Sequence, residues 1–194
     1  MADFRKVTPS RRSTVPDKKH YGDYKPILRE DFDQRCGYCG DHDFFSETYY
    51  EVDHFVPKGQ LKTLSETTYT NLVYSCRSCN NSKRAKWPTK DEMVHNDGKQ
   101  GFIDPCHADY AQQFERLADG SVHAITELGQ WMWRALNMGN PSHRLKWKLE
   151  QLRVILMKTD KLEIDDPDEL RQIKELNAKY RSYEETLKGY PIFG

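Results

Sequence analysis

Two pairs of cysteines with the same spacing are the first residues whose types suggest chemistry. Each pair has the pattern Cys-x-x-Cys, and 36 residues separate the two pairs. Such a turn brings two thiolates to one ion, and two turns complete a tetrahedral zinc site. The candidate ligands are Cys36, Cys39, Cys76 and Cys79. Because four thiolates leave no open position, we expect a structural Zn²⁺ that ties together the helices beside the two turns.

Redox-active or merely buried cysteines are the alternatives to zinc. The first residues lack an apolar segment of the kind that directs secretion, and no run of about 18 apolar residues occurs. We therefore expect a cytoplasmic protein with no membrane span and no disulfides, in which paired Cys-x-x-Cys turns favour a metal. Cys106 has no neighbour at this spacing and is expected to be an idle thiol.

An aspartate and a histidine, Asp53 and His54, lie between the cysteine pairs. A neutral imidazole near pH 7 is suited to removing a proton from water. A carboxylate offers the hard oxygen that Mg²⁺ prefers. Neighbours on a strand point to opposite faces, so the two side chains have separate tasks unless the chain bends there. A lone histidine is more often a core or surface residue, but the flanking aspartate, Pro57 and the cysteine turns favour a functional role.

Three residues near the second cysteine pair complete the candidate site. Asn80 directly follows a zinc ligand, and its carbonyl oxygen can complete a Mg²⁺ shell; the alternative is a local hydrogen bond at a helix start. Asn71 could pin the loop that carries His54 or could cap a turn. Lys83 lies one helical turn after Asn80, so we expect it to reach a phosphate.

The net charge of the 194-residue chain is +0, which argues against a uniformly basic nucleic-acid-binding protein. The distribution is uneven, however. Between Lys58 and Lys90 there are seven basic residues and one acidic residue, whereas nine acidic and six basic residues lie between Asp160 and Lys188. Local potential steers a polyanion, so we expect contacts to nucleic acid from Lys58, Arg77, Lys83, Arg84 and Lys86. For Arg84 and Lys86, a solvated face is an equally open interpretation.

Periodicity and turn residues predict an α+β fold with three parts. Residues 1–24 are rich in Arg, Lys, Pro and Ser, and we expect a flexible basic arm there. Residues 25–100 should form the metal-bound core: a helix from Pro26, a strand over 48–54, a short strand at 72–74 and a helix from Ser78 or Cys79 to Lys86. Residues 101–194 should add a β-hairpin with a two-residue turn at Asp119-Gly120, followed by helices over 126–136, 142–158 and 167–187.

The motifs C-G-Y-C, E-V-D-H-F-V-P-K and N-L-V-Y-S-C-R-S-C-N-N-S-K together resemble the HNH, or ββα-metal, nucleases with a zinc-stabilised finger. The resemblance covers about residues 30–88. It implies that Asp53 and Asn80 bind one divalent ion, Mg²⁺ or Mn²⁺, that His54 is the general base and that Asn71 orients it. Asn80 stands where the family name has its last His, which leaves the preferred ion open. The implied products carry 5′ phosphate and 3′ hydroxyl ends.

A looser resemblance extends beyond this core. Residues 102–106, the Asp119-Gly120 turn and the Leu-rich helix ending near Arg153 are similar to longer HNH proteins of bacterial anti-phage systems, including the HNH components of Septu-type and retron-linked systems. That similarity implies a nuclease effector that cuts DNA, with RNA left open, beside an ATPase partner.

Two other interpretations remain open from the sequence. A zinc-ribbon module that binds nucleic acid or a protein would need the cysteines and the basic stretch, but not Asp53 or Asn80. A nuclease that is silent until a partner activates it would agree with the neutral net charge. The helices over 126–188 would then be candidate docking surfaces, although they could simply pack over the core.

Overall fold

The computed structural model describes residues 2–46, 49–160 and 162–189. The strands are β1 (Ala2–Asp3), β2 (Tyr50–His54), β3 (Leu72–Cys76), β4 (Phe114–Arg116) and β5 (Val122–Ala124). The helices are α1 (Lys25–Asp31), α2 (Arg77–Lys83), α3 (Ala108–Ala111), α4 (Glu127–Ala135), α5 (Pro141–Thr159) and α6 (Pro167–Gly189). Short 3₁₀ turns occur at Tyr21–Tyr24, Asp43–Phe45, Lys58–Gln60 and Tyr69–Asn71.

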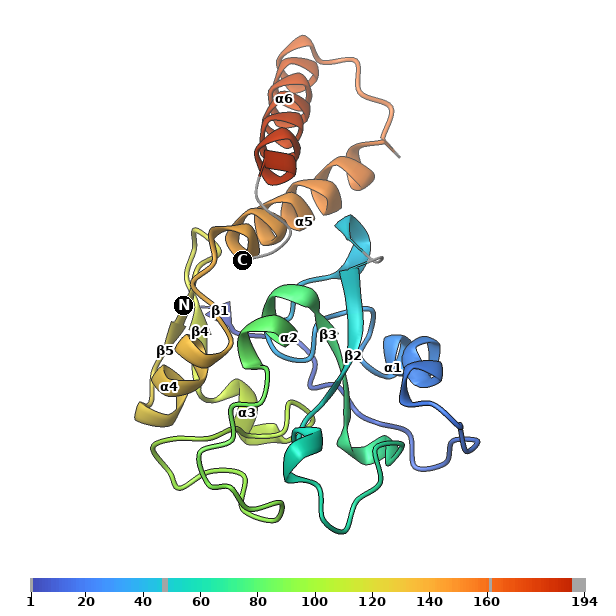
Figure 1. The fold of residues 1–194 in the computed structure, drawn as a ribbon. Coiled ribbons are helices and arrows are strands. Elements are labelled where there is room, and N and C mark those ends of the chain that lie inside the picture. Colours follow the sequence, from blue (N-terminus) through green and yellow to red (C-terminus); the bar gives the residue numbers. More distant parts are fainter. Residues whose placement is uncertain (1, 47–48, 161, 190–194) are drawn as a thin grey trace.

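Strands β2 and β3 form an antiparallel ribbon at the centre of the molecule (Figure 1). The register pairs Asp53 with Val73 and His54 with Leu72. Every residue of β3 is buried, and α2 begins at the next residue, Arg77. The predicted order of strand, strand and helix within an α+β fold is therefore confirmed. Helix α2 ends at Lys83, before the predicted Lys86, because Arg84 adopts a positive φ of 47° that no right-handed helix continues through.

A second sheet has the strand order β1-β4-β5 and lies beside α4. The predicted hairpin is present, but its turn is longer than two residues. Leu117 N–H donates to Ser121 O, Gly120 N–H donates to Leu117 O, and Gly120 has φ +90°. This is the three-residue loop in which a left-handed glycine forms a bulge. A Cβ on Gly120 would lie 2.5 Å from the Trp147 ring, so packing against α5 also requires glycine.

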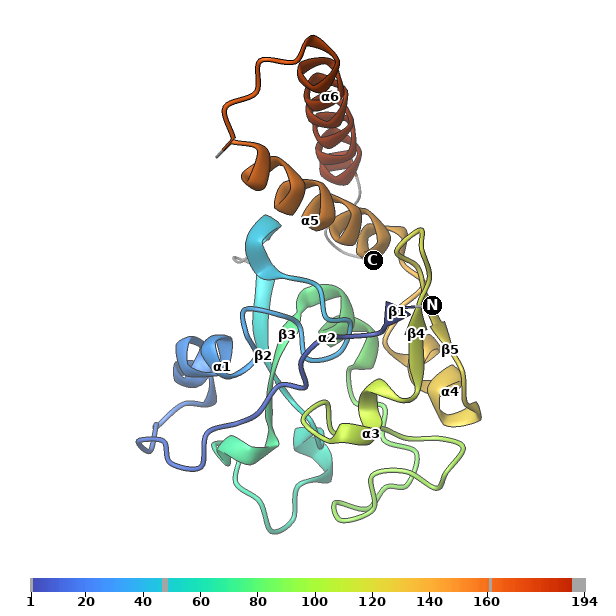
Figure 2. The same ribbon diagram turned by 180° about the vertical axis from the view of Figure 1, so that it is seen from behind.

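The N-terminal segment is packed along the core instead of forming the flexible arm that we expected for residues 1–24. Figure 2 shows it crossing the back of the molecule between β1 and α1. Phe4 is buried, and β1 pairs with β4. Arg11 donates to Leu72 O at 2.7 Å and pairs with Asp104 at 2.9 Å. The composition of residues 1–24 did not predict this packing, because the acceptors that its arginines bind lie on distant parts of the chain.

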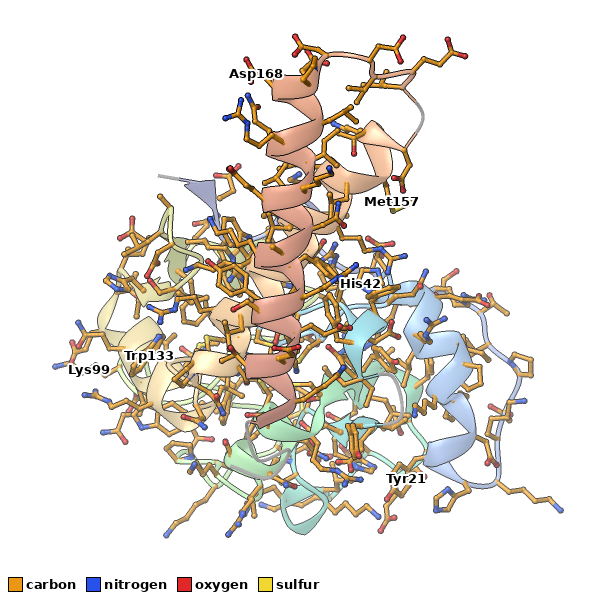
Figure 3. The ribbon with its side chains drawn as sticks, turned by 90° about the horizontal axis from the view of Figure 1, so that it is seen from above. Tyr21, His42, Lys99, Trp133, Met157 and Asp168 are labelled. Atoms are coloured by element: carbon orange, nitrogen blue, oxygen red, sulfur yellow. The ribbon has the colours of Figure 1, made fainter. Side chains whose placement is uncertain are left out.

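Helices α5 and α6 form a hairpin that projects from the rest of the molecule (Figure 1). Figure 3 shows Asp168 at the start of α6, at the outer end of this hairpin. Leu149 and Leu152 of α5 are buried, whereas α6 has no buried residue along Pro167–Gly189. Within the described residues, no helix is long and apolar enough to cross a membrane.

Candidate active site and zinc centre

The four cysteines converge on one point. Cys36, Cys39, Cys76 and Cys79 are all buried, and their Sγ atoms lie within 4.8 Å of one another. The Sγ atoms of Cys39 and Cys76 are 3.8 Å apart. Zn–S bonds of about 2.3 Å in a tetrahedron place the sulfurs roughly 3.8 Å apart, so the cluster has the size and donor set for zinc. These residues would hold the ion, and the expected chemistry is structural.

Backbone contacts give the first cysteine turn its shape. Gly37 N–H donates to Tyr74 O at 2.8 Å, and Gly40 N–H donates to Cys36 O at 2.9 Å. A Cβ on Gly37 would lie 2.7 Å from both the Phe32 ring and the Val73 side chain. The turn can therefore lie against β3 only with glycine at this position. The β3 residue that it contacts, Val73, is the register partner of Asp53 on β2.

His54 is buried at the end of β2, and its ring is oriented by a backbone acceptor. Its Nε2 lies 2.8 Å from Glu66 O. Because a carbonyl only accepts, Nε2 carries the proton in the neutral ring and Nδ1 is the free base. The Tyr21 ring packs edge-on against the imidazole, with the two ring centroids 4.6 Å apart. Burial lowers the pKa of His54, so the neutral form dominates near pH 7.

Asn71 closes the loop that follows His54. Its Oδ1 accepts from Val56 N–H at 2.8 Å, and its Nδ2 donates to Val56 O at 3.1 Å. The Phe55 N–H also donates to Asn71 O at 2.8 Å. Three hydrogen bonds thus fix the backbone immediately after the histidine. Asn71 therefore holds the backbone next to His54, and its side-chain bonds go to Val56 and not to the imidazole.

Asp53 is held by two donors that reach the same oxygen. Tyr38 Oη–H donates to Asp53 Oδ2 at 2.5 Å, and Lys83 Nζ lies 2.9 Å from that atom. Among the described residues, neither contact involves Oδ1, which is left for a ligand. Burial raises the pKa of Asp53 and lowers that of Lys83, because desolvation disfavours both charges; the contact between them opposes both shifts.

Lys83 is placed differently from the expectation. We expected it to bind phosphate, but its side chain is 0% exposed and also donates to His54 O at 2.7 Å. Helix α2 packs its 80–83 face against β2, so the ammonium meets the carboxylate before it can meet solvent. Lys83 therefore supports the Asp53–His54 pair from inside and makes no surface contact.

Asn80 lies next to Glu51. Its Nδ2 donates to Glu51 Oε2 at 2.7 Å, and Arg77 Nε donates to Glu51 Oε1 at 2.7 Å. Since the amide nitrogen is bound to a carboxylate, the orientation of Asn80 is set with Oδ1 as its free acceptor. Glu51 and Asp53 share one face of β2, and Asn80 and Lys83 share one face of α2. The contacts Asn80–Glu51 and Lys83–Asp53 therefore join the same face of α2 to the same face of β2.

The remaining basic residues differ in their access to solvent. Lys58 is exposed, pairs with Glu66 at 2.9 Å and lies over the Tyr21 ring. Arg84 and Lys86 are exposed. Arg84 donates to Asn81 O of α2, and Lys86 donates to Ser82 O of α2 and, at 3.2 Å, to Ala135 O at the end of α4. Arg77 is half-buried in its pair with Glu51, and its expected contact to nucleic acid stays a prediction.

Three residues of this constellation were missed from the sequence. They are Tyr38, Glu51 and Glu66. Alternation along the strand could have identified Glu51, because it shares a face with Asp53. Tyr38 lies inside the cysteine turn, where only the packing of that turn on β3 aims its ring at Asp53. Glu66 contributes a backbone carbonyl, for which the residue type gives no signal.

Part of the chain that holds this constellation matches a known family model. Residues 36–86 match the family model described as HNH endonuclease. No curated protein and no solved structure matches the chain. The matched residues contain both cysteine turns, β2, β3 and α2. They form an HNH endonuclease domain, and the match and the four-cysteine cluster together support a nuclease of the HNH family.

Proposed function

We propose that this domain hydrolyses phosphodiester bonds of DNA, with His54 as the general base and a divalent ion held by Asp53 and Asn80. The observation that carries the proposal is the orientation of the imidazole. Glu66 O occupies the Nε2 side, so the unprotonated Nδ1 is available to a water molecule.

The ion site is supported by the chemistry of the two donors. Asp53 Oδ1 and Asn80 Oδ1 are hard oxygens, and the partners of Oδ2 and Nδ2 orient both groups. Two protein oxygens suit Mg²⁺ or Mn²⁺, which keep water and phosphate oxygens as their other ligands. When bound, such an ion would stabilise the negative charge that develops on the phosphate and the leaving 3′ oxygen.

In this mechanism His54 Nδ1 takes a proton from the attacking water. The hydroxide adds to phosphorus and the P–O3′ bond breaks, which leaves a 5′ phosphate. The departing 3′ oxygen takes a proton from a solvent water to become a hydroxyl, and His54 later releases its proton to solvent. Asn71 keeps the loop after His54 fixed during the proton transfer, and Lys83 keeps Asp53 in place. Lys58, Arg84 and Lys86 supply exposed positive charge for the backbone of the substrate. Such contacts position DNA without reading its sequence, so weak sequence specificity is expected.

Cleavage assays on labelled duplex DNA, single-stranded DNA and RNA, in Mg²⁺ and in Mn²⁺, test the proposal. His54→Ala should abolish cleavage, and Asp53→Ala should abolish it while leaving zinc bound. His107→Ala is the matched control, because His107 is exposed on α3's N-terminal side, outside the HNH domain. Unchanged cleavage by His54→Ala would refute the base assignment. Nucleic-acid binding that survives Asp53→Ala, with no cleavage by the unaltered protein, would support the zinc-ribbon alternative.

We further propose that the protein is the cytoplasmic nuclease effector of an anti-phage system and works beside an ATPase. The looser resemblance of residues 102–106, the Asp119-Gly120 turn and the Leu-rich helix ending near Arg153 to HNH components of such systems supports this role. The projecting α5–α6 hairpin supports it physically, since α6 contacts α5 and buries none of its own residues. Co-expression with an adjacent ATPase gene, followed by gel filtration of the unaltered protein and of a variant ending after α5, should show a complex only with the hairpin intact. In a phage plating assay, cells that carry the His54→Ala variant should lose the protection that the unaltered protein gives.

A further inference from the structure

Tyr38 connects the zinc-type cysteine cluster to the proposed catalytic carboxylate. It stands between the ligands Cys36 and Cys39, and its side chain is fully buried. Its hydroxyl lies 2.5 Å from Asp53 Oδ2. One residue thus belongs by its backbone to the metal-bound turn and by its side chain to the active site.

The backbone around Tyr38 is fixed from three directions. Gly37 N–H donates to Tyr74 O at 2.8 Å, and Arg5 donates to Gly37 O at 2.8 Å. Tyr38 O accepts from the Tyr110 hydroxyl at 3.0 Å. Because a phenol ring has only two side-chain torsions, a fixed backbone in a packed core leaves its hydroxyl little freedom. The position of that hydroxyl is therefore set by the cysteine turn.

The consequence falls on the rotation of the Asp53 carboxylate. Lys83 and Tyr38 both bind Oδ2, and they approach it from different elements, α2 and the cysteine turn. Lys83 alone would leave the carboxylate free to turn about its last torsion, because an ammonium is a compact charge without directional preference between the two oxygens. The second, directional donor removes that freedom and so fixes the position of Oδ1 as well.

We propose that Tyr38 is a positioning residue that makes the divalent-ion site depend on the zinc-bound turn. The inference rests on the proposed function, since it presumes that Asp53 binds an ion. Partners that orient metal-binding carboxylates typically change metal affinity about 10- to 100-fold when removed. Loss of the Tyr38 hydroxyl should therefore weaken binding of the ion by a similar factor without displacing zinc.

Tyr38→Phe in the full-length, zinc-loaded protein tests this directly. The readouts are Mn²⁺ affinity from electron paramagnetic resonance, zinc content, and the Mg²⁺ concentration that gives half-maximal cleavage. We expect roughly 10-fold weaker Mn²⁺ binding, a matching rise in the half-maximal Mg²⁺ concentration, and one zinc retained per chain. Cleavage should recover at high Mg²⁺, a recovery that general damage to the fold would not give. Tyr50→Phe is the matched control, because Tyr50 is equally buried but donates to the backbone O of Asp41.

Unchanged Mn²⁺ affinity in Tyr38→Phe, or an equal loss in Tyr50→Phe, would overturn the inference. Should Tyr38→Phe lose zinc, Tyr110→Phe decides the question: it keeps the Tyr38 hydroxyl and frees only its backbone, and unchanged Mn²⁺ binding there would overturn the inference too. Asp53→Ala distinguishes failure of the proposed ion site from failure of the positioning role of Tyr38. If the unaltered protein binds Mn²⁺ no better than Asp53→Ala, the proposed function fails; if only Tyr38→Phe retains full binding, the positioning role alone fails.

Discussion

Lys83 Nζ lies 2.9 Å from Asp53 Oδ2 and 2.7 Å from the backbone O of His54. One buried cation therefore contacts both members of the Asp-His pair, from a helix that begins beside a zinc-type ligand. The contact compensates a buried carboxylate that would otherwise be unpaired, and it ties α2 to the last residues of β2. We therefore expect both the stability of the fold and the proposed active site to depend on the same ion pair.

Replacement of Lys83 with methionine keeps most of the side-chain volume but removes the charge. Leaving one partner of a buried pair typically costs about 3–5 kcal/mol, so we expect a loss of that order in the free energy of unfolding. Cleavage should fall with it, because Asp53 loses one of its two donors. Urea denaturation of the zinc-loaded protein measures the first effect. Lys86→Met, at an exposed lysine on the same segment, is the control, and an equally small change in both variants would contradict the prediction.

The pH dependence of cleavage should reflect the burial of His54. Burial lowers the pKa of this histidine below its ordinary value of 6.5. A general base works only when unprotonated, so activity at saturating Mg²⁺ should persist as the pH falls through 6.5 and decline at lower pH. Tyr21→Ala exposes the imidazole to solvent and should shift the acidic decline of the pH–rate profile to higher pH. Tyr21→Phe keeps the ring and should leave that decline where it is. An acid limb at or above 6.5 in the unaltered protein would count against this account.

Removal of zinc should unfold the HNH domain. Structural zinc supplies on the order of 10 kcal/mol to small folds of this kind, which is comparable to the whole net stability of a typical domain. We expect circular dichroism to show loss of structure after chelation, and recovery on adding Zn²⁺ but not Mg²⁺. Cys79→Ser should behave like the chelated protein. Cys106→Ser is the control, since Cys106 lies outside the cluster and burial raises its pKa to about 11, which disfavours the thiolate that binds metal.

The N-terminal segment should contribute to stability through one arginine far more than through its neighbour. Arg11 is mostly buried and bonds to Leu72 O and Asp104, whereas Arg12 is exposed in its contacts with Glu30 and Asp31. Removing Arg11 leaves buried acceptors unpaired and should cost about 3 kcal/mol of unfolding free energy. Arg12→Ala should have little effect, since exposed ion pairs are screened by solvent. Equal losses in urea denaturation would show that the segment is not anchored as described.

Local patterns were sufficient for much of the fold. Period-two and helical spacing predicted β2, β3 and the helices α4, α5 and α6 to within a few residues, and the repeated Cys-x-x-Cys spacing predicted the zinc-type cluster. Two predictions were wrong. The basic composition of residues 1–24 suggested a flexible arm, and the turn at Asp119-Gly120 was expected to have only two residues. In both cases contacts with distant residues, Leu72 for Arg11 and Trp147 for Gly120, decided the outcome.

The sequence by itself determined which groups could do chemistry, because the cysteine spacing, Asp53-His54 and Asn80 are properties of short stretches of chain. Only the tertiary structure decided where those groups point. Lys83 follows Asn80 by one helical turn, as the sequence indicates, but the packing of α2 on β2 turns its ammonium inward to Asp53 and away from solvent. Likewise, Tyr38 meets Asp53 only because the cysteine turn lies against β3. Such contacts join residues 15 to 30 positions apart, and no local spacing encodes the angle at which two elements meet.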